Sequence, residues 1–265
     1  MAIVRKISLH PLFAAALDLV AAALVLWQLS LAASFSVFVG WMVLRTLWWL
    51  VLTELCYYPP FVSRWRHFAT LLFFNAALMG LLLFVDSIFL VGVVYIFLAF
   101  VPAVSFVLVP NRPDSLSVLA KPERRWRLAM TTLAMGGLWA MVSAVGAFQL
   151  MSGWWLVWLS VEALGILIAV SMWWWREYGR PYSGQFFIAA GIMALIFGEL
   201  AYIVYLWPIG YLAVGFLMAA LWYTLWLLLR FSLTPEGIDW QRQKWFLMGM
   251  AIVITFYLVL VARWK

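Results

Sequence analysis

Cysteine, histidine and charged residues are scarce in this chain. Among its 265 residues there are one cysteine, Cys56, and two histidines, and Asp, Glu, Lys and Arg together make up only 10%. A single cysteine excludes an internal disulfide and any metal or cluster site that needs several cysteines. The shortage of charge excludes an ordinary soluble domain of this length, because such a domain needs far more polar surface to cover its core.

The middles of the long apolar runs lack the residues that several intramembrane chemistries need. Every lysine lies outside these runs or at an edge: Lys6, Lys121, Lys244 and Lys265. A retinal Schiff base, which needs a lysine deep in a span, is therefore excluded. His10 and His67 fall at the ends of runs, where we expect interfacial residues and not haem or zinc ligands.

No catalytic motif replaces these missing groups. The chain has no glycine loop of the kind that cradles phosphates. Acidic residues in the loops leave open a metal-assisted enzyme that acts on a lipid phosphate: Asp114, Glu123, Glu177, Glu236 and Asp239. Scattered acids among basic neighbours are more typical of solvated charge, so we assign no catalytic residue, metal or cofactor and favour a non-enzyme.

Apolar residues dominate what is present. They account for 68% of the chain, and the mean hydropathy is +1.05. Because a membrane-spanning helix needs about 20 apolar residues, the runs predict an all-α bundle of nine spans in a single transmembrane domain, residues 1–265. The predicted spans are 11–31, 35–57, 67–86, 88–109, 127–150, 153–175, 185–206, 208–229 and 245–263.

The distribution of positive charge predicts the orientation. The gaps after the first, third, fifth and seventh spans contain no lysine or arginine, whereas the N-terminus and the other gaps hold most of the 17. Basic residues in short loops favour the cytoplasmic side. We therefore expect a cytoplasmic N-terminus, four hairpins with tight outer turns, and a ninth helix that ends outside. Bases spread over short loops do not form a nucleic-acid-binding face.

Tryptophan is abundant, with 19 residues. Nine fall at predicted span ends, where indoles form an aromatic belt at the headgroups: Trp154, Trp155, Trp173, Trp174, Trp175, Trp207, Trp240, Trp245 and Trp264. Six lie deeper, and bulky packing or a lipid-facing position is favoured for them over a lipid or pigment cavity: Trp48, Trp49, Trp139, Trp158, Trp222 and Trp226.

A few polar side chains fall inside the predicted spans. A charge near the bilayer centre is costly, so such residues turn inward and pair. We expect a polar cluster of Arg45, Asn75, Glu162 and Glu199, with Asp18 and Glu54 as secondary polar residues nearer the inner surface. Arg45 needs a partner most, because arginine does not lose its proton, and Glu162 matches its depth best. The cluster is either a functional site or proton relay, or an ion pair that fixes helix register.

Small residues within the spans predict close contacts between helices. They are Gly136, Gly137, Gly146, Gly191, Gly198 and Gly215.

The last third of the chain resembles a multi-pass membrane protein family of candidate-phylum bacteria whose function is unknown. The residues that carry the resemblance are Glu199 before Leu206-Trp207-Pro208, then Arg230, Leu233-Thr234 and the terminal Ala262-Arg263-Trp264. The resemblance implies a bacterial inner-membrane location and no activity.

Two functions follow from these observations. The first is a non-catalytic integral subunit or scaffold that binds membrane lipids and other membrane subunits, or a second copy of itself. The second is a transporter of a small or lipid-like molecule, coupled through Glu162 or Glu199. A cavity that reaches Glu162 would favour transport, and a filled bundle with Arg45 paired would favour the scaffold.

Overall fold

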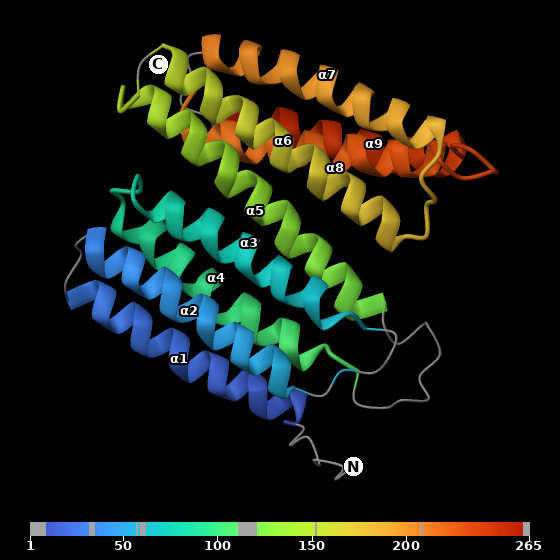
Figure 1. The fold of residues 1–265 in the computed structure, drawn as a ribbon. Helices are drawn as coiled ribbons and strands as arrows, with labels where there is room; N and C mark the ends of the chain where they lie inside the picture. The colour runs from blue at the N-terminus through green and yellow to red at the C-terminus, as the bar shows by residue number, and fades with distance from the viewer. Residues whose placement is uncertain are drawn as a thin grey trace. The chain divides into compact units, whose positions relative to one another are not determined.

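A computed structural model describes residues 9–31, 35–56, 58, 62–110, 121–151, 153–207 and 209–261. These residues form nine α-helices, with one turn of π-helix after the last, and no strand among them (Figure 1). The helices are α1 Pro11–Leu31, α2 Phe35–Leu55, α3 Arg64–Leu82, α4 Ile88–Val107, α5 Lys121–Ala147, α6 Trp154–Glu177, α7 Gly184–Leu206, α8 Tyr211–Ser232 and α9 Trp240–Phe256. The prediction of an all-α fold is confirmed.

Local sequence accounts for where several helices begin. The Oγ of Ser63 accepts a hydrogen bond from the Arg66 amide at the start of α3, and Ser183 caps α7 in the same way through the Phe186 amide. The helix α5 begins six residues before the predicted span, because Pro122 suits the first turn of a helix and Glu123 complements its dipole.

Seven of the described helices are long and apolar enough to cross a membrane. They are α1, α2, α4, α5, α6, α7 and α8, which supports a multi-pass membrane protein. The helix α3 falls outside this set because it opens with Arg64, Arg66 and His67, and α9 has only 17 residues. The count of nine spans and their orientation stay predictions.

The helices gather into two compact units, Met1–Ala134 and Met135–Lys265. In the first unit α1 runs along α4, and α2 packs on both α1 and α3 (Figure 1). The second unit contains the C-terminal part of α5 with α6, α7, α8 and α9. Consecutive helices of this unit are paired, α6 with α7, α7 with α8 and α8 with α9. The expected single domain over 1–265 stays a prediction.

Glycine allows α5 and α8 to approach closely within the second unit. A Cβ added at Gly215 would lie 2.6 Å from the Cβ of Ala140, and one added at Gly136 would lie 3.3 Å from the Cβ of Ala219. The predicted role of small residues in packing is confirmed at these two glycines. It is wrong at Gly191, which faces open space.

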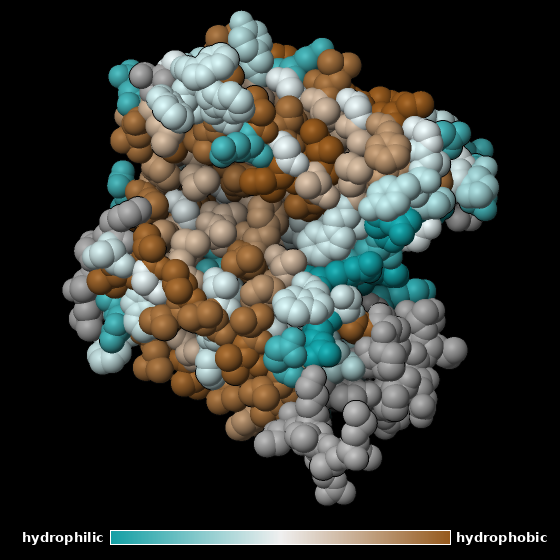
Figure 2. Space-filling view, viewed as in Figure 1, coloured by the Kyte–Doolittle hydropathy of each residue, from teal (hydrophilic) through white to brown (hydrophobic). Residues whose placement is uncertain are grey.

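The surfaces of both units carry many large apolar side chains. Figure 2 shows hydrophobic residues over much of the visible face. Ile88 is 89% exposed, Phe89 77% and Trp155 70%, values that a water-facing surface does not favour. Such a surface is what contact with lipid tails requires.

Candidate functional site

A buried ion pair joins the first two helices. The Nη2 of Arg45 on α2 lies 3.1 Å from the Oδ2 of Asp18 on α1, and its Nη1 donates to the Asp18 carbonyl oxygen at 3.1 Å. The indole Nε1 of Trp49, one turn along α2, donates to the other carboxylate oxygen, Oδ1, at 2.7 Å. Arg45 is 5% exposed, and Asp18 and Trp49 are fully buried. Both carboxylate oxygens therefore accept a hydrogen bond, and the charge of the guanidinium is neutralised, within one helical hairpin.

Asn75 lies close to this ion pair. With Arg45 it lines a small cavity of about 10 Å³ among α1, α2, α3 and α4. Asn75 is 3% exposed, and its Nδ2 is buried with no hydrogen-bond partner among the described residues. A void of this size holds about one water molecule, which is what an unpaired amide beside a guanidinium requires. One such water would satisfy the Asn75 amide, so the burial of Asn75 and Arg45 does not require a larger cavity.

Only part of the predicted cluster is brought together. Arg45 and Asn75 meet in the first unit, and Asp18 joins them although we expected it to be secondary. The prediction that Arg45 pairs with Glu162 is wrong, because Asp18 occupies the guanidinium. Glu162 was expected because its depth in the membrane matches that of Arg45, but matching depth does not identify the partner. Asp18 and Arg45 lie about 10 Å and about 15 Å from the same end of their hairpin at 1.5 Å per residue, and the long arginine side chain bridges the difference.

The remaining secondary residue, Glu54, forms an ordinary surface ion pair. Its Oε2 accepts from Arg64 Nη1 at 2.8 Å, and the two side chains are 42% and 40% exposed. This pair links the end of α2 to the start of α3. Because its side chain is largely exposed, Glu54 is not a buried reactive carboxylate.

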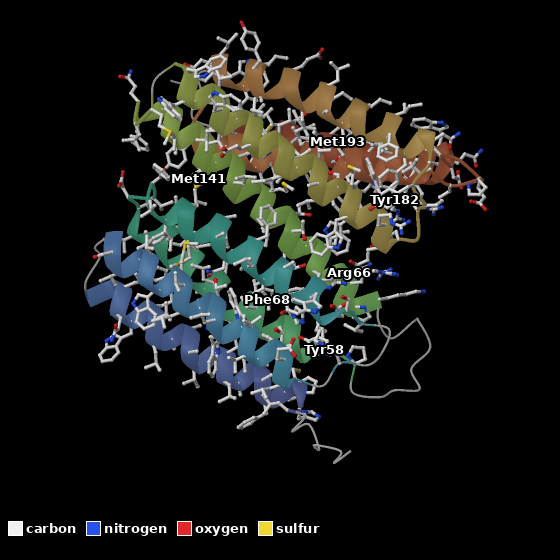
Figure 3. All side chains as sticks on the ribbon, in the orientation of Figure 1. Tyr58, Arg66, Phe68, Met141, Tyr182 and Met193 are labelled. Carbon is white, nitrogen blue, oxygen red and sulfur yellow. The ribbon has the colours of Figure 1, made fainter. Side chains whose placement is uncertain are left out.

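Sequence reasoning missed a second buried polar group around His67. The Nδ1 of His67 lies 2.6 Å from the hydroxyl of Tyr58, and its Nε2 lies 2.7 Å from the Oγ of Ser105 on α4. Figure 3 labels Tyr58, which lies between the end of α2 and the start of α3. His67 is fully buried although it lies in the first turn of α3, and its interfacial position stays a prediction. Nothing in the sequence near His67 indicates that Ser105, 38 residues away, completes its surroundings.

The direction of these hydrogen bonds follows from counting protons. The Ser105 hydroxyl donates to the Pro102 carbonyl oxygen at 2.5 Å, so it must accept from the Nε2–H of His67. Nδ1 is then the acceptor, and Tyr58 donates to it. Burial raises the pKa of the Tyr58 hydroxyl well above its ordinary value, which keeps that proton in place. His67 thus has no free lone pair with which to take the Ser105 proton, and the pair cannot act as a nucleophile and base.

Glu162 and Glu199 are placed differently from the acids of the first unit. Both are exposed, on α6 and α7 of the second unit. Neither makes a hydrogen bond or ion pair with another described residue. The expectation that intramembrane carboxylates turn inward therefore fails for these two residues.

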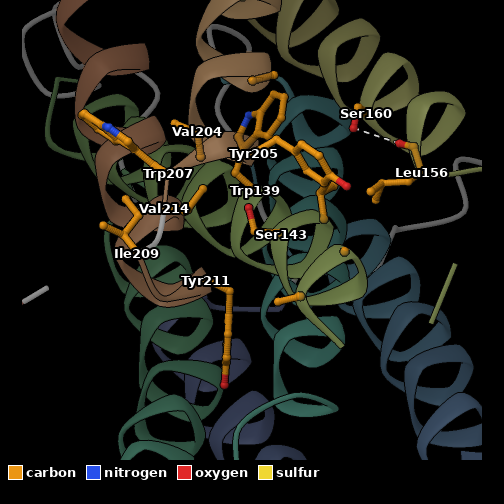
Figure 4. A pocket seen from close by; sticks show the side chains of 14 residues that line it. Trp139, Ser143, Leu156, Ser160, Val204, Tyr205, Trp207, Ile209, Tyr211 and Val214 are labelled. Atoms are coloured by element: carbon orange, nitrogen blue, oxygen red, sulfur yellow. Dashed lines mark hydrogen bonds between the residues drawn. The ribbon is translucent and has the colours of Figure 1, made fainter. Parts of the chain in front are cut away.

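The second unit also contains a cavity of about 270 Å³ (Figure 4). Its walls come from α5, α6, α7 and the start of α8. They include Trp139, Ser143, Ser160, Tyr205 and Tyr211. Trp139 is 2% exposed, and its Nε1 has no partner among the described residues. Neither Glu162 nor Glu199 lines this cavity or the neighbouring groove between α6 and α7.

Tryptophans form the core of the second unit at the other end of α6. Trp174, Trp175, Trp222 and Trp226 are fully buried, so a place in an aromatic belt is wrong for the first two. The Nε1 of Trp222 donates to Ser171 at 2.9 Å, and that of Trp175 donates to the Trp226 carbonyl oxygen at 3.2 Å. For Trp222 and Trp226 the predicted packing role is confirmed. Trp154 and Trp155 remain exposed, as a belt requires.

Comparisons with protein-family models, curated proteins and solved structures find no match. Among the described residues no group of three or more histidine, cysteine, aspartate or glutamate side chains could hold a metal ion. The fold and the apolar helices define the class, a multi-pass helical membrane protein.

Proposed function

We propose that this protein is a non-catalytic integral subunit or scaffold that binds membrane lipids and other membrane proteins. The observation that carries this proposal is the placement of the charged residues within the helices. Asp18 and Arg45 neutralise each other inside the first unit, whereas Glu162 and Glu199 face away from the interior of the second. An ion pair that holds two helices together, and carboxylates that face away from any cavity, are what we expect of a structural protein.

The same observation speaks against transport coupled through these carboxylates. A coupling carboxylate must reach water on at least one side during the cycle, so it should line a cavity. The cavity of about 270 Å³ does not include Glu162 or Glu199 among its walls. The cavity beside Arg45 has room for about one water molecule.

Proton movement through reconstituted protein tests this proposal. Vesicles that contain the purified protein and a trapped pH-sensitive dye should hold an imposed pH gradient as long as protein-free vesicles do. The matched variants are Glu162→Gln and Glu199→Gln, which should behave in the same way. A protein-dependent proton leak that disappears in either variant would replace the scaffold with a transporter.

The cavity at Trp139 supports a second candidate, the binding or transport of a small amphipathic molecule. An indole N–H without a partner, beside two serine hydroxyls, suits a molecule with an oxygen acceptor and an apolar body. Trp139→Phe keeps the ring and removes the donor. If this candidate is right, the variant loses a lipid that the unaltered protein retains through purification, as native mass spectrometry would detect.

The proposal includes a bacterial inner membrane, as the resemblance of the last third implies, and a cytoplasmic N-terminus, as the charge distribution implies. The α6–α7 hairpin tests the orientation. In a Cys56→Ser background, a cysteine in place of Trp154 should react with an impermeant thiol reagent on intact cells. One in place of Tyr182, at the other end of the hairpin, should not. Both residues are exposed, at 69% and 62%, so the reversed labelling pattern would reverse the orientation.

A further inference from the structure

The cavity of the second unit adjoins the groove between α6 and α7. The cavity has a volume of about 270 Å³, and the groove has a volume of about 520 Å³. Four residues line both spaces, Leu156 and Ser160 of α6 and Ala201 and Tyr205 of α7. The two spaces therefore share a border, and a molecule that crosses this border would occupy both.

The border contains two small residues and two larger ones. Leu156 and Tyr205 reach toward α5, because a Cβ added at Gly146 would lie 3.2 Å from Leu156 Cδ2 and 3.7 Å from Tyr205 Cε2. Tyr205 is 67% exposed, and its hydroxyl makes no hydrogen bond with another described residue. No hydrogen bond therefore holds Tyr205 in place, and the remaining border residues, Ser160 and Ala201, add little bulk between the cavity and the groove.

The cavity presents hydroxyl groups and no charge. The hydroxyl of Ser143 makes no hydrogen bond with another described residue. Ser160 donates to the Leu156 carbonyl oxygen at 2.9 Å, and its Oγ can still accept a hydrogen bond (Figure 4). Every described residue that lines the cavity is uncharged, so a phosphate or carboxylate inside it would be a buried charge without a partner. The cavity therefore suits an uncharged group with hydroxyl and ester oxygens.

The groove is apolar and as long as one leaflet of a membrane is thick. Its walls include Val157, Val161 and Leu164 of α6 and Gly198 of α7. Val157 and Val161 are each 51% exposed, so the groove opens to the surface of the unit. From Trp154 to Leu164 the groove follows α6 for about 15 Å at 1.5 Å per residue, half of a hydrocarbon core of about 30 Å. An acyl chain of one leaflet therefore matches the groove in polarity and in length.

We propose that the cavity and the groove form one binding site for a lipid with a small uncharged head, of the diacylglycerol class. The glycerol head lies in the cavity and bonds to Ser143 and Ser160. One acyl chain crosses the border and lies in the groove against Gly198, and the second chain stays among the surrounding lipids. The groove lies within the range of about 300–1,000 Å³ that is typical of small-molecule sites. This inference rests on the proposed function, which includes lipid binding, and names the class of lipid and its site.

Photo-cross-linking with a diacylglycerol analogue tests the proposal. The probe carries a diazirine in one acyl chain and is mixed at low mole fraction into phosphatidylcholine vesicles that contain the purified protein. Mass spectrometry of the digested protein should locate the cross-link at residues 154–164 or 198–205. Unlabelled diacylglycerol should compete with the probe, whereas the same amount of phosphatidylglycerol, whose head is anionic, should not. Cross-links spread evenly over the exposed faces of the helices would overturn the proposal.

One pair of variants tests the groove. Gly198→Leu places a side chain in the groove and should reduce cross-linking about tenfold, the scale of effect that a change of shape has in a hydrophobic pocket. Gly191→Leu is the matched control, because Gly191 lies two turns away on the same face of α7, outside the groove and in open space. It should cross-link as the original protein does. Unchanged cross-linking of Gly198→Leu, or an equal loss in both variants, would contradict a chain in the groove.

A second pair of variants tests the cavity. Ser143→Ala removes the unpaired hydroxyl and should weaken cross-linking about twofold to tenfold, the range for one lost hydrogen bond. Tyr202→Phe, which removes a hydroxyl that lines the groove but not the cavity, should have no effect. Equal competition by phosphatidylglycerol and diacylglycerol, or no loss in Ser143→Ala, would overturn the uncharged head. A proton leak in the dye experiment would instead overturn the scaffold function, independently of this result.

Discussion

The two units handle polar groups inside their helices in opposite ways. In the first, Asp18, Arg45 and Trp49 bind one another, and a second chain of hydrogen bonds runs through Tyr58, His67 and Ser105. In the second, tryptophans fill the core, and the two carboxylates face outward. A buried polar network is stable only when its donors and acceptors are paired. A core of tryptophans does not require charged residues. Charged side chains therefore hold helices together inside the first unit, whereas Glu162 and Glu199 lie on the surface of the second.

Removing one member of the buried ion pair should have the largest effect. Asp18→Ala should lower the free energy of unfolding by about 3–5 kcal/mol, because it leaves the guanidinium of Arg45 buried and unpaired. Titration with SDS in mixed micelles measures this change. The double variant Asp18→Leu and Arg45→Leu should recover most of the loss, since no charge remains to be neutralised.

Glu162→Gln is the matched change in the second unit. It should leave the unfolding free energy of the purified protein within about 0.5 kcal/mol of its original value, as for other surface substitutions. A loss as large as that of Asp18→Ala would remove the contrast between the units.

The tryptophan core of the second unit should respond almost as strongly as the ion pair. Trp226→Ala should cost about 3–5 kcal/mol, because it leaves a large cavity among buried rings. Trp155→Ala, at a site that is 70% exposed, is the control and should cost far less in the same SDS titration. Equal losses would mean that the second unit depends on its surface as much as on its core.

The close approach of α5 and α8 allows a smaller test. Gly215→Ala would bring a methyl group to 2.6 Å from the Cβ of Ala140, and we expect a loss of about 1–3 kcal/mol from overpacking. Gly191→Ala adds the same methyl group in open space and should gain up to about 1 kcal/mol from helix propensity. Thermal unfolding in detergent should therefore move in opposite directions for the two variants, and a shift of the same sign would contradict the packing described here.

The exposed ion pair of the first unit should matter least. Glu54→Gln should change the unfolding free energy by about 0–1 kcal/mol, because both side chains of the pair are largely solvated. The difference between the variant and the original protein should shrink at high salt, which screens surface charges. A large loss of unfolding free energy that high salt does not reduce would mean that the Glu54–Arg64 pair stabilises the protein as the buried Asp18–Arg45 pair does.

Apolar run length, turn residues and capping serines determined the helices from the sequence alone. A helix lies in every predicted span, and α1 begins and ends where its run does, at Pro11 and Leu31. These features are local, since each helix satisfies its own backbone hydrogen bonds and needs only a long apolar run to suit a membrane. The single arginine deep in a span likewise indicated from the sequence that a buried acid must accompany it.

Only the tertiary structure decided which acid that is, which tryptophans are buried, and which way Glu162 and Glu199 point. The physical reason lies in the lipid. In a water-soluble protein a polar stripe marks the outer face of a helix, but lipid tails are as apolar as a protein core, so the helices of this chain carry little such pattern. Rotation about each helix axis is then set by packing between residues far apart in sequence, such as Gly136 with Gly215 and Trp175 with Trp226. Asp18 binds Arg45 because both belong to one hairpin and the arginine side chain is long enough to reach it, a condition that depth along the helix does not express.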